Sequence, residues 1–284
     1  MKWFSEKTDV GTLLSKRQYG RAIKMLEKQL RDDPESVSLR LQLADALERD
    51  GQKKQAIAIL AKLVDELTAE GFVAKAIALL KKIQRIDPSL SIEDKLGRIL
   101  PEPVEGTSRL VAPKPQQVEV GEETTIETLD SFGSVITSEV VLADTWLGDV
   151  ERRDDFHWSA LTRGLSDREV VELFSNIRLI VKRPGAIIYT EGEPGDSFYV
   201  LAQGRARSYK RDSRGHNRQI AVLRSGDFFG TRIAVGDVTR IRTVTAADDC
   251  EILEIDKESF ERLAQRRPQL REQVMSIASQ LEAD

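Results

Sequence analysis

Residues 226–246 hold the side chains whose types and spacing best fit chemistry on an anion. The aromatic pair at 228–229 is followed by Gly230, by a short segment able to form one or two helical turns, and by Arg240 at the start of a β-rich run. Backbone N–H groups at the start of a helix point towards negative charge, and a guanidinium can bind a phosphate through two parallel hydrogen bonds. The stretch therefore predicts a small anion cradle.

The elements that would position this cradle follow from the residues around it. Residues 156–174 predict one or two short helices with Ser166 as an N-cap, and Pro268 divides residues 257–284 into two helices. Between them, short β-rich segments alternate with turns that contain Gly and Asp, a pattern typical of a β sandwich or jelly-roll barrel. The predicted strands are residues 177–183, 186–192, 197–211, 218–224, 242–247 and 251–256.

This part of the chain resembles the cyclic nucleotide-binding domains of catabolite-activator regulators and kinase regulatory subunits. The resemblance is carried by the turn and strand at 192–200, by Gly204, and by residues 226–230, which match the lead into the family's phosphate-binding cassette. It implies a jelly-roll barrel with flanking helices over residues 144–284, with cyclic AMP or cyclic GMP as the ligand. We expect Gly192, Gly195, Gly204, Gly215 and Gly226 to serve turns that need unusual backbone angles.

The implied cassette departs from the family's pattern at several positions. Arg240 stands where the family arginine pairs with the cyclic phosphate, but Thr231 replaces a glutamate that binds the ribose. Ile241 and Arg242 replace small residues, and Arg232 replaces an apolar one. The ligand site implied by the resemblance is Gly230, Thr231, Arg240, Ile241, Arg242 and Thr243, with Arg232 as an extra anion contact.

These departures leave three outcomes open. A cyclic mononucleotide is one outcome. Its binding would be weakened, because loss of the ribose contact should cost roughly 1.5–3 kcal/mol and the bulk at 241 and 242 could block the phosphate. Arg240 and Arg242 share a face on a strand, which would suit a more highly charged anion such as a cyclic dinucleotide. The third outcome is a ligand-free interaction module with a vestigial site, for which Arg240→Ala should change stability little.

The N-terminal part, residues 8–100, predicts an array of antiparallel helical hairpins. Amphipathic helices are indicated at residues 19–34, 37–50, 53–70 and 72–88, with Pro and Gly between them. Ala22 and Ala56 lie 34 residues apart in matching contexts, and the region resembles the tetratricopeptide repeat, which has this period. Such a short solenoid offers a concave face to a peptide or partner protein. The partner's identity and self-association stay open.

Residues 101–143 are Pro-rich and acidic and predict an extended linker, with a short strand at 135–142. Residues 101–155 hold 4 basic and 13 acidic residues, whereas residues 1–100 have a net charge of +4 and residues 156–284 of +1. No part is basic enough to predict a nucleic-acid surface.

We find no apolar run long enough for a membrane span and no signal peptide, and the single Cys250 cannot form an internal disulfide. These features predict a cytoplasmic protein.

No nucleophile accompanies a base, and neither His157 nor His216 belongs to a metal-binding or catalytic cluster. We therefore expect no enzyme, no catalytic residue, no metal and no required cofactor. The favoured function is a bacterial-type signalling adaptor that senses a cyclic nucleotide and binds a protein partner through its helical repeat, with a homodimer contact through the C-terminal helices. A catabolite-activator-type transcription factor is disfavoured, because no helix-turn-helix follows before Asp284.

Overall fold

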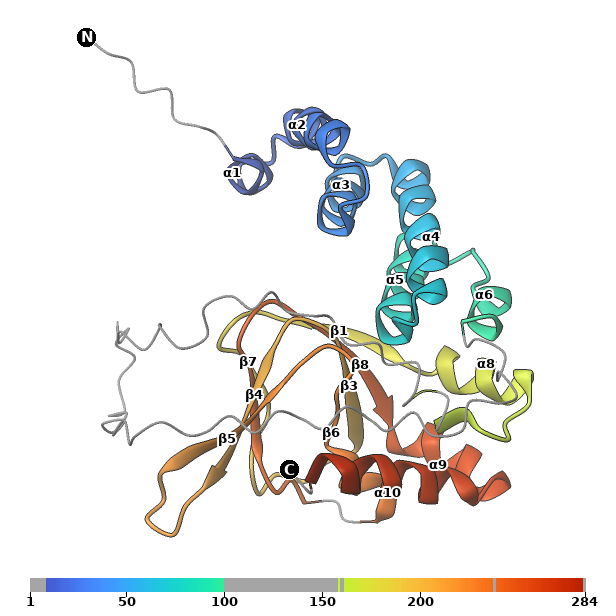
Figure 1. Ribbon diagram of the computed structural model, residues 1–284, viewed down its shortest axis with the longest axis vertical. Coiled ribbons are helices and arrows are strands. Elements are labelled where there is room, and N and C mark those ends of the chain that lie inside the picture. The colour runs from blue at the N-terminus through green and yellow to red at the C-terminus, as the bar shows by residue number, and fades with distance from the viewer. Residues whose placement is uncertain (1–8, 100–157, 159–160, 237–238, 283–284) are drawn as a thin grey trace.

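The computed structural model of the chain describes residues 9–99, 158, 161–236 and 239–282. The linker predicted at 101–143, the strand predicted at 135–142 and His157 lie outside the described residues. In the described part, an arch of helices stands over a pair of β-sheets, and two further helices lie beneath the sheets (Figure 1).

The arch is formed by six short to medium helices in chain order. The four helices predicted from periodicity are confirmed to within two residues at each end. Pro34 and Pro88 follow the second and the fifth helix closely, where a proline ring cannot continue the helical hydrogen bonds. The helices are α1 (Val10–Ser15), α2 (Tyr19–Asp32), α3 (Val37–Arg49), α4 (Lys53–Ala69), α5 (Val73–Ile86) and α6 (Glu93–Gly97).

Helices α1 to α5 of the arch each pack against their neighbours in the chain. Ala22 and Ala56, the pair that marked the repeat, are fully buried, and their small side chains let adjacent helices approach closely. Figure 1 shows α3 and α5 on the inner side of the arch, facing the sheets, and α2 and α4 on the outer side. Helix α5 is the most buried of them, with ten buried residues, because it is packed both within the arch and on the sheets.

The β part consists of two four-stranded antiparallel sheets, in the orders β1-β8-β3-β6 and β2-β7-β4-β5. Apolar side chains from both sheets form one buried cluster between them. The segment predicted as one strand at 197–211 is two, divided at Gly204. That glycine has φ +88°, and a Cβ there would lie 2.5 Å from the Asp249 carbonyl oxygen. The strands are β1 (Arg178–Lys182), β2 (Ile187–Tyr189), β3 (Ser197–Gln203), β4 (Ala206–Arg211), β5 (Asn217–Leu223), β6 (Phe228–Phe229), β7 (Thr243–Ala246) and β8 (Cys250–Asp256).

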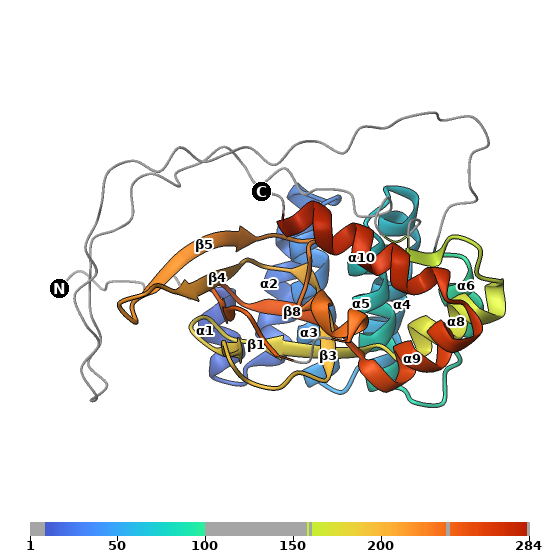
Figure 2. The ribbon, with the colours of Figure 1, turned by 90° about the horizontal axis from the view of Figure 1, so that it is seen from below.

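Among the described residues, three helices flank the sheets: α8 (Asp167–Ser175), α9 (Lys257–Arg266) and α10 (Gln269–Glu282). Ser166 caps α8 as predicted, in a capping box with Glu169, and the break between α9 and α10 falls at Pro268 as predicted. Helices α9 and α10 lie beneath the sheets and are at the front when the molecule is seen from below (Figure 2). Helix α10 packs against β6 and against η1 (Thr231–Val235), the short 3-10 helix that follows β6.

The helical arch and the sheets are joined by direct contacts. Helix α5 packs on β1, β3 and β8, and α6 packs on α8. The buried Lys81 of α5 donates from Nζ to the Ser175 carbonyl at 2.8 Å, and the neighbouring Lys82 forms an ion pair with Glu251 of β8. One continuous cluster of buried apolar residues runs from Val10 to Val274. The two parts therefore share a hydrophobic core, and the predicted boundaries at 100 and 144 stay predictions.

Candidate ligand site

The predicted cradle begins where β6 ends. Gly230 adopts a left-handed conformation, with φ 69° and ψ 18°, which turns the chain from β6 into η1 (Thr231–Val235), a five-residue 3-10 helix. Only glycine adopts this conformation without a steric cost, so the position has a backbone reason for its residue type. Strand β6 pairs with β3, and this pairing holds the start of the cassette against the centre of the first sheet.

Arg240 is fixed between this cassette and the turn at 192–196. Its backbone accepts a hydrogen bond from Gly192 N at 2.8 Å and donates one to the Glu193 carbonyl at 2.9 Å. Its side chain is only 7% exposed; Nη1 donates to the Gly230 carbonyl at 3.2 Å and Nη2 to the Ser197 carbonyl at 2.6 Å. The structure therefore brings Arg240 and Gly230 into direct contact.

Aromatic rings pack against the guanidinium of Arg240. Its Cζ lies 4.4 Å from the ring centroid of Tyr189 and 5.3 Å from that of Tyr199, both within the range of a cation–π interaction. The two tyrosines and Phe229 stack on one another with centroids 5.2–6.1 Å apart. Burial raises the pKa of Tyr189 to about 12, against the opposing charges of Arg240 and Arg242, so its hydroxyl is neutral at physiological pH.

Two glycines leave the space that the guanidinium occupies. A Cβ on Gly195 would lie 2.5 Å from Cζ of Arg240, and one on Gly230 would lie 2.6 Å from Nη1. Gly195 is not among the glycines with positive φ, unlike Gly192, Gly204, Gly215 and Gly226. The expectation that Gly195 serves an unusual backbone angle is therefore wrong, and its role is to make room for Arg240.

The other predicted site residues have different surroundings. Thr231 is buried at the start of η1, and Arg232 is exposed on the same helix. Ile241 and Arg242 are half-buried, and Thr243 Oγ1 accepts a hydrogen bond from the backbone of Glu191 at 3.0 Å, so Thr243 joins β7 to the end of β2.

The sequence reasoning missed Tyr189, Tyr199 and the Ser197 carbonyl. Both tyrosines lie in predicted strands, but nothing in their spacing indicates that they meet at Arg240.

Among the described residues, no carboxylate lies within ion-pair distance of Arg240. The carboxylates around it are engaged elsewhere: Glu254 pairs with Arg178 at 2.6 Å, Glu193 accepts from the Thr190 backbone at 3.0 Å, and Asp196 accepts from the Ser197 hydroxyl at 3.0 Å. Buried charges in proteins are normally paired or bound to ions. The site therefore presents a buried cation that the described part of the chain does not neutralise.

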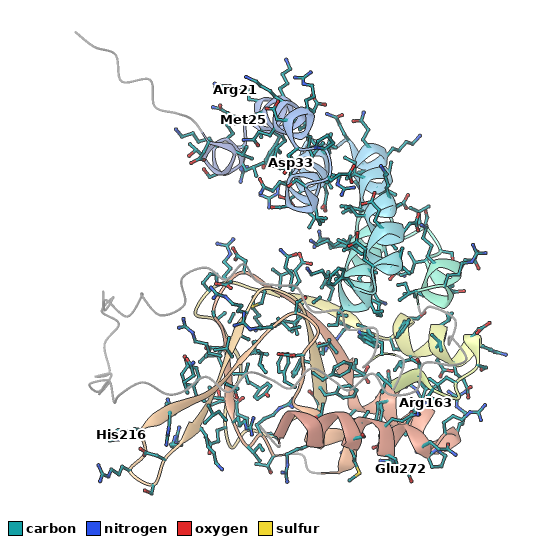
Figure 3. All side chains as sticks on the ribbon, viewed as in Figure 1. Arg21, Met25, Asp33, Arg163, His216 and Glu272 are labelled. Atoms are coloured by element: carbon teal, nitrogen blue, oxygen red, sulfur yellow. The ribbon has the colours of Figure 1, made fainter. Side chains whose placement is uncertain are left out.

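Catalytic and metal chemistry find little support in the described residues. His216 lies at the tip of the β4–β5 hairpin (Figure 3), where it is 3.7 Å from Asp212 of its own turn. No group of three or more His, Cys, Asp or Glu residues is placed to hold a metal ion in the described ranges. Within those ranges, no helix has the length and apolarity needed to cross a membrane.

Comparison with known families agrees with this geometry. Residues 180–267 match the family model of the cyclic nucleotide-binding domain. The chain carries a cyclic nucleotide-binding domain. Residues 13–70, which include helices α2 to α4 of the arch, match a tetratricopeptide repeat model, so a tetratricopeptide-like repeat precedes the cyclic nucleotide-binding domain.

Curated relatives match part of the chain, and two of them represent the cAMP- and cGMP-dependent kinases. The cAMP-dependent protein kinase regulatory subunit of Yarrowia lipolytica is 37% identical over 83 residues, which are 29% of this chain and 21% of the relative. The cGMP-dependent protein kinase of Caenorhabditis briggsae is 37% identical over 81 residues, 28% of this chain and 11% of the relative. The chain thus spans about a fifth or less of the length of these relatives. These two proteins are fungal and nematode, and the expected bacterial origin stays a prediction.

Among solved structures, the catabolite activator protein of Thermus thermophilus is similar to this chain with a TM-score of 0.40 and 25% identity. The match covers 44% of this chain and 59% of that protein.

Proposed function

We propose that this protein is a non-enzymatic, cytoplasmic signalling adaptor. Its cyclic nucleotide-binding domain, a jelly-roll barrel in this proposal, senses a cyclic AMP- or cyclic GMP-type ligand at Arg240. Its tetratricopeptide-like repeat, a short solenoid, binds a protein partner. The family matches in both parts of the chain support this assignment, as do relatives named as a cAMP-dependent protein kinase regulatory subunit and a cGMP-dependent protein kinase.

One observation carries the sensor part of the proposal: Arg240 is buried and has no carboxylate partner among the described residues. A guanidinium has five N–H donors, and described residues accept hydrogen bonds from two of its atoms, Nη1 and Nη2. A phosphate could therefore accept from the remaining N–H groups without displacing either backbone carbonyl. It would also neutralise a charge that burial otherwise makes costly.

The contacts around the cassette offer a way for ligand binding to alter the rest of the molecule. Helix α10 packs on η1 and β6, so a shift of the cassette would change the surface that α9 and α10 expose. Strand β3 supplies the Ser197 carbonyl bound by Arg240 and also contacts α5 of the repeat. A homodimer through α9 and α10 belongs to this proposal, and Met275 of α10, which is 52% exposed, would be covered by such a contact.

Calorimetry on the full chain tests the sensor. We expect heat of binding with at least one of cyclic AMP, cyclic GMP and cyclic di-GMP. Arg240→Lys should weaken that binding about a hundredfold, because lysine keeps the charge but lacks the planar pair of donors. Absence of heat with all three ligands up to high-micromolar concentration would overturn the sensor. Retained affinity in Arg240→Lys would overturn the assignment of Arg240 as the phosphate contact.

A ligand-free scaffold is the second candidate, and the packing of Arg240 favours it. The guanidinium already binds two backbone carbonyls and stacks on Tyr189, so it has a structural role in the absence of any ligand. The expectation that Arg240→Ala would change stability little in a scaffold therefore no longer follows, because either function predicts destabilisation. Only ligand binding separates the two: the scaffold predicts none in the wild-type chain.

A further inference from the structure

A second arginine stands beside the proposed phosphate contact. Arg242 lies two residues after Arg240, in the bend that leads directly into β7. It is half-buried, and it forms no hydrogen bond or ion pair with the residues that the structure describes. A long cationic side chain in this position has given up part of its hydration without gaining a partner among the described residues.

Arg240 and Arg242 both lie before β7, so the strand face that the sequence predicted them to share is not formed, and the contacts of the neighbouring residues place Arg242 instead. Thr243, the residue after Arg242, begins β7 and accepts a hydrogen bond from the Glu191 backbone at 3.0 Å, and Val244 is buried between the sheets. Val244 pairs with Tyr189 of β2, the residue whose ring lies under the Arg240 guanidinium. The positive charges of Arg240 and Arg242 both act on the Tyr189 hydroxyl, which agrees with this placement.

The nearby acidic groups do not neutralise this second charge. Glu191 follows β2, and its backbone binds Thr243, the residue after Arg242. Its carboxylate accepts a hydrogen bond from the Arg211 backbone at 2.8 Å. Thr231, at the start of the cassette, is buried and neutral, so it contributes no negative charge that would repel a second anionic group. The site thus offers two cations, one buried and one half-buried, without a carboxylate partner for either among the described residues.

We propose that Arg240 and Arg242 together select a nucleotide ligand that carries two negative charges, with Arg242 as the residue that determines this specificity. The inference rests on the proposed function, because it assumes that Arg240 binds a phosphate, and it replaces the cyclic mononucleotide of that proposal with a more highly charged nucleotide as the preferred ligand. A cyclic mononucleotide has a single phosphodiester charge and neutralises only one arginine. A cyclic dinucleotide has two phosphodiester charges, and a nucleoside 5′-monophosphate has about −1.5 to −2 on one phosphate. These two sources share the required chemistry.

The experiment compares ligands and variants by calorimetry on the full chain. Cyclic di-GMP, cyclic di-AMP, 5′-GMP and cyclic AMP are titrated into the wild type, Arg242→Gln and Arg218→Gln. Arg218→Gln is the matched control, since Arg218 is exposed on β5 and is not one of the candidate site residues. We expect at least one dianionic ligand to bind more tightly than cyclic AMP. Arg242→Gln should weaken that ligand about tenfold to a hundredfold and change cyclic AMP affinity by less than about threefold.

The outcomes separate this inference from the proposed function. Cyclic AMP binding at least as tight as every dianionic ligand, or an equal effect of Arg242→Gln on all ligands, would overturn the role of Arg242 and leave the sensor intact. No binding of any ligand would overturn the sensor itself and this inference with it. A preference for 5′-GMP over both cyclic dinucleotides would identify one doubly charged phosphate, rather than two single charges, as the recognised group. An equal melting temperature for the three proteins confirms that the variants are folded.

Discussion

The guanidinium of Arg240 lies over the ring of Tyr189, with 4.4 Å between Cζ and the ring centroid. This contact joins the segment that follows the cassette to β2 of the second sheet, while the hydrogen bond from Arg240 to Ser197 reaches β3 of the first sheet. One side chain therefore links the two sheets at the proposed ligand site. Ligand binding there would act on a contact that also stabilises the fold.

Replacement of Tyr189 tests this link. Tyr189→Ala removes the ring under Arg240 and its stacking on Tyr199, and we expect a loss of about 2–3 kcal/mol in the free energy of unfolding. Tyr189→Phe keeps the ring and should stay within about 1 kcal/mol of the wild type. Urea unfolding of the full chain measures both. Equal losses in the two variants would show that the hydroxyl, rather than the ring, is the stabilising group.

Gly195→Ala tests the space reserved for the guanidinium. The added Cβ would overlap Arg240, and overpacking of this kind costs about 1–3 kcal/mol. In an Arg240→Ala background the obstacle is gone, so the same substitution should cost much less. Gly20→Ala is a suitable control, because Gly20 lies in α2 with open space around its Cα, and alanine there should stabilise by about 0.5–1 kcal/mol. An unchanged cost in the Arg240→Ala background would contradict the assigned role.

Lys81 predicts a specific dependence of stability on pH. Burial lowers the pKa of Lys81 from 10.5 to about 8, so between pH 8 and pH 10.5 the unfolded chain holds a proton that the folded chain has released. Stability contributed by this group therefore rises with pH across that window and is lowest below pH 8. Lys81→Met should abolish this rise and be at least as stable as the wild type at pH 7.

Urea unfolding at pH 7 and pH 10 measures the effect as a difference between variant and wild type. Lys24→Met, at an exposed position of α2, is the control and should retain the wild-type rise. A rise of the same size in Lys81→Met would mean that Lys81 is not the group responsible.

The ion pair between Lys82 and Glu251 tests the junction of repeat and sheets. Both side chains are mostly buried, at 20% and 16% exposure, and we expect a coupling of about 1 kcal/mol in a double-mutant cycle of alanine variants. The exposed pair Lys95–Asp65 within the repeat should show a coupling near zero. Because the two parts share a core, unfolding should occur in a single transition. Two separate transitions would show that the repeat and the sheets unfold independently.

Much of the molecule follows from local patterns in the sequence. Helix periodicity with Pro and Gly breaks located α2 to α5 to within two residues, and the Ser166 cap and the Pro268 break bound the helices around the sheets. Residues 226–240 contain Gly230 and Arg240, the turn glycine and the arginine of the candidate site. These features depend on backbone sterics and on side chains near each other along the chain, so the sequence alone determines them.

What surrounds Arg240 was decided only by tertiary structure. Tyr189 and Ser197 reach it because β2, β3 and the segment after η1 converge, and the clearance at Gly195 exists only once they do. The packing of α5 on the sheets likewise joins residues about a hundred or more positions apart. Contacts of this kind leave no periodic trace, because the apolar period of a strand or helix indicates which face is buried and not which distant residues that face meets. The sequence by itself determined the elements and the charged residue of the site, and the fold determined which groups hold that charge in place.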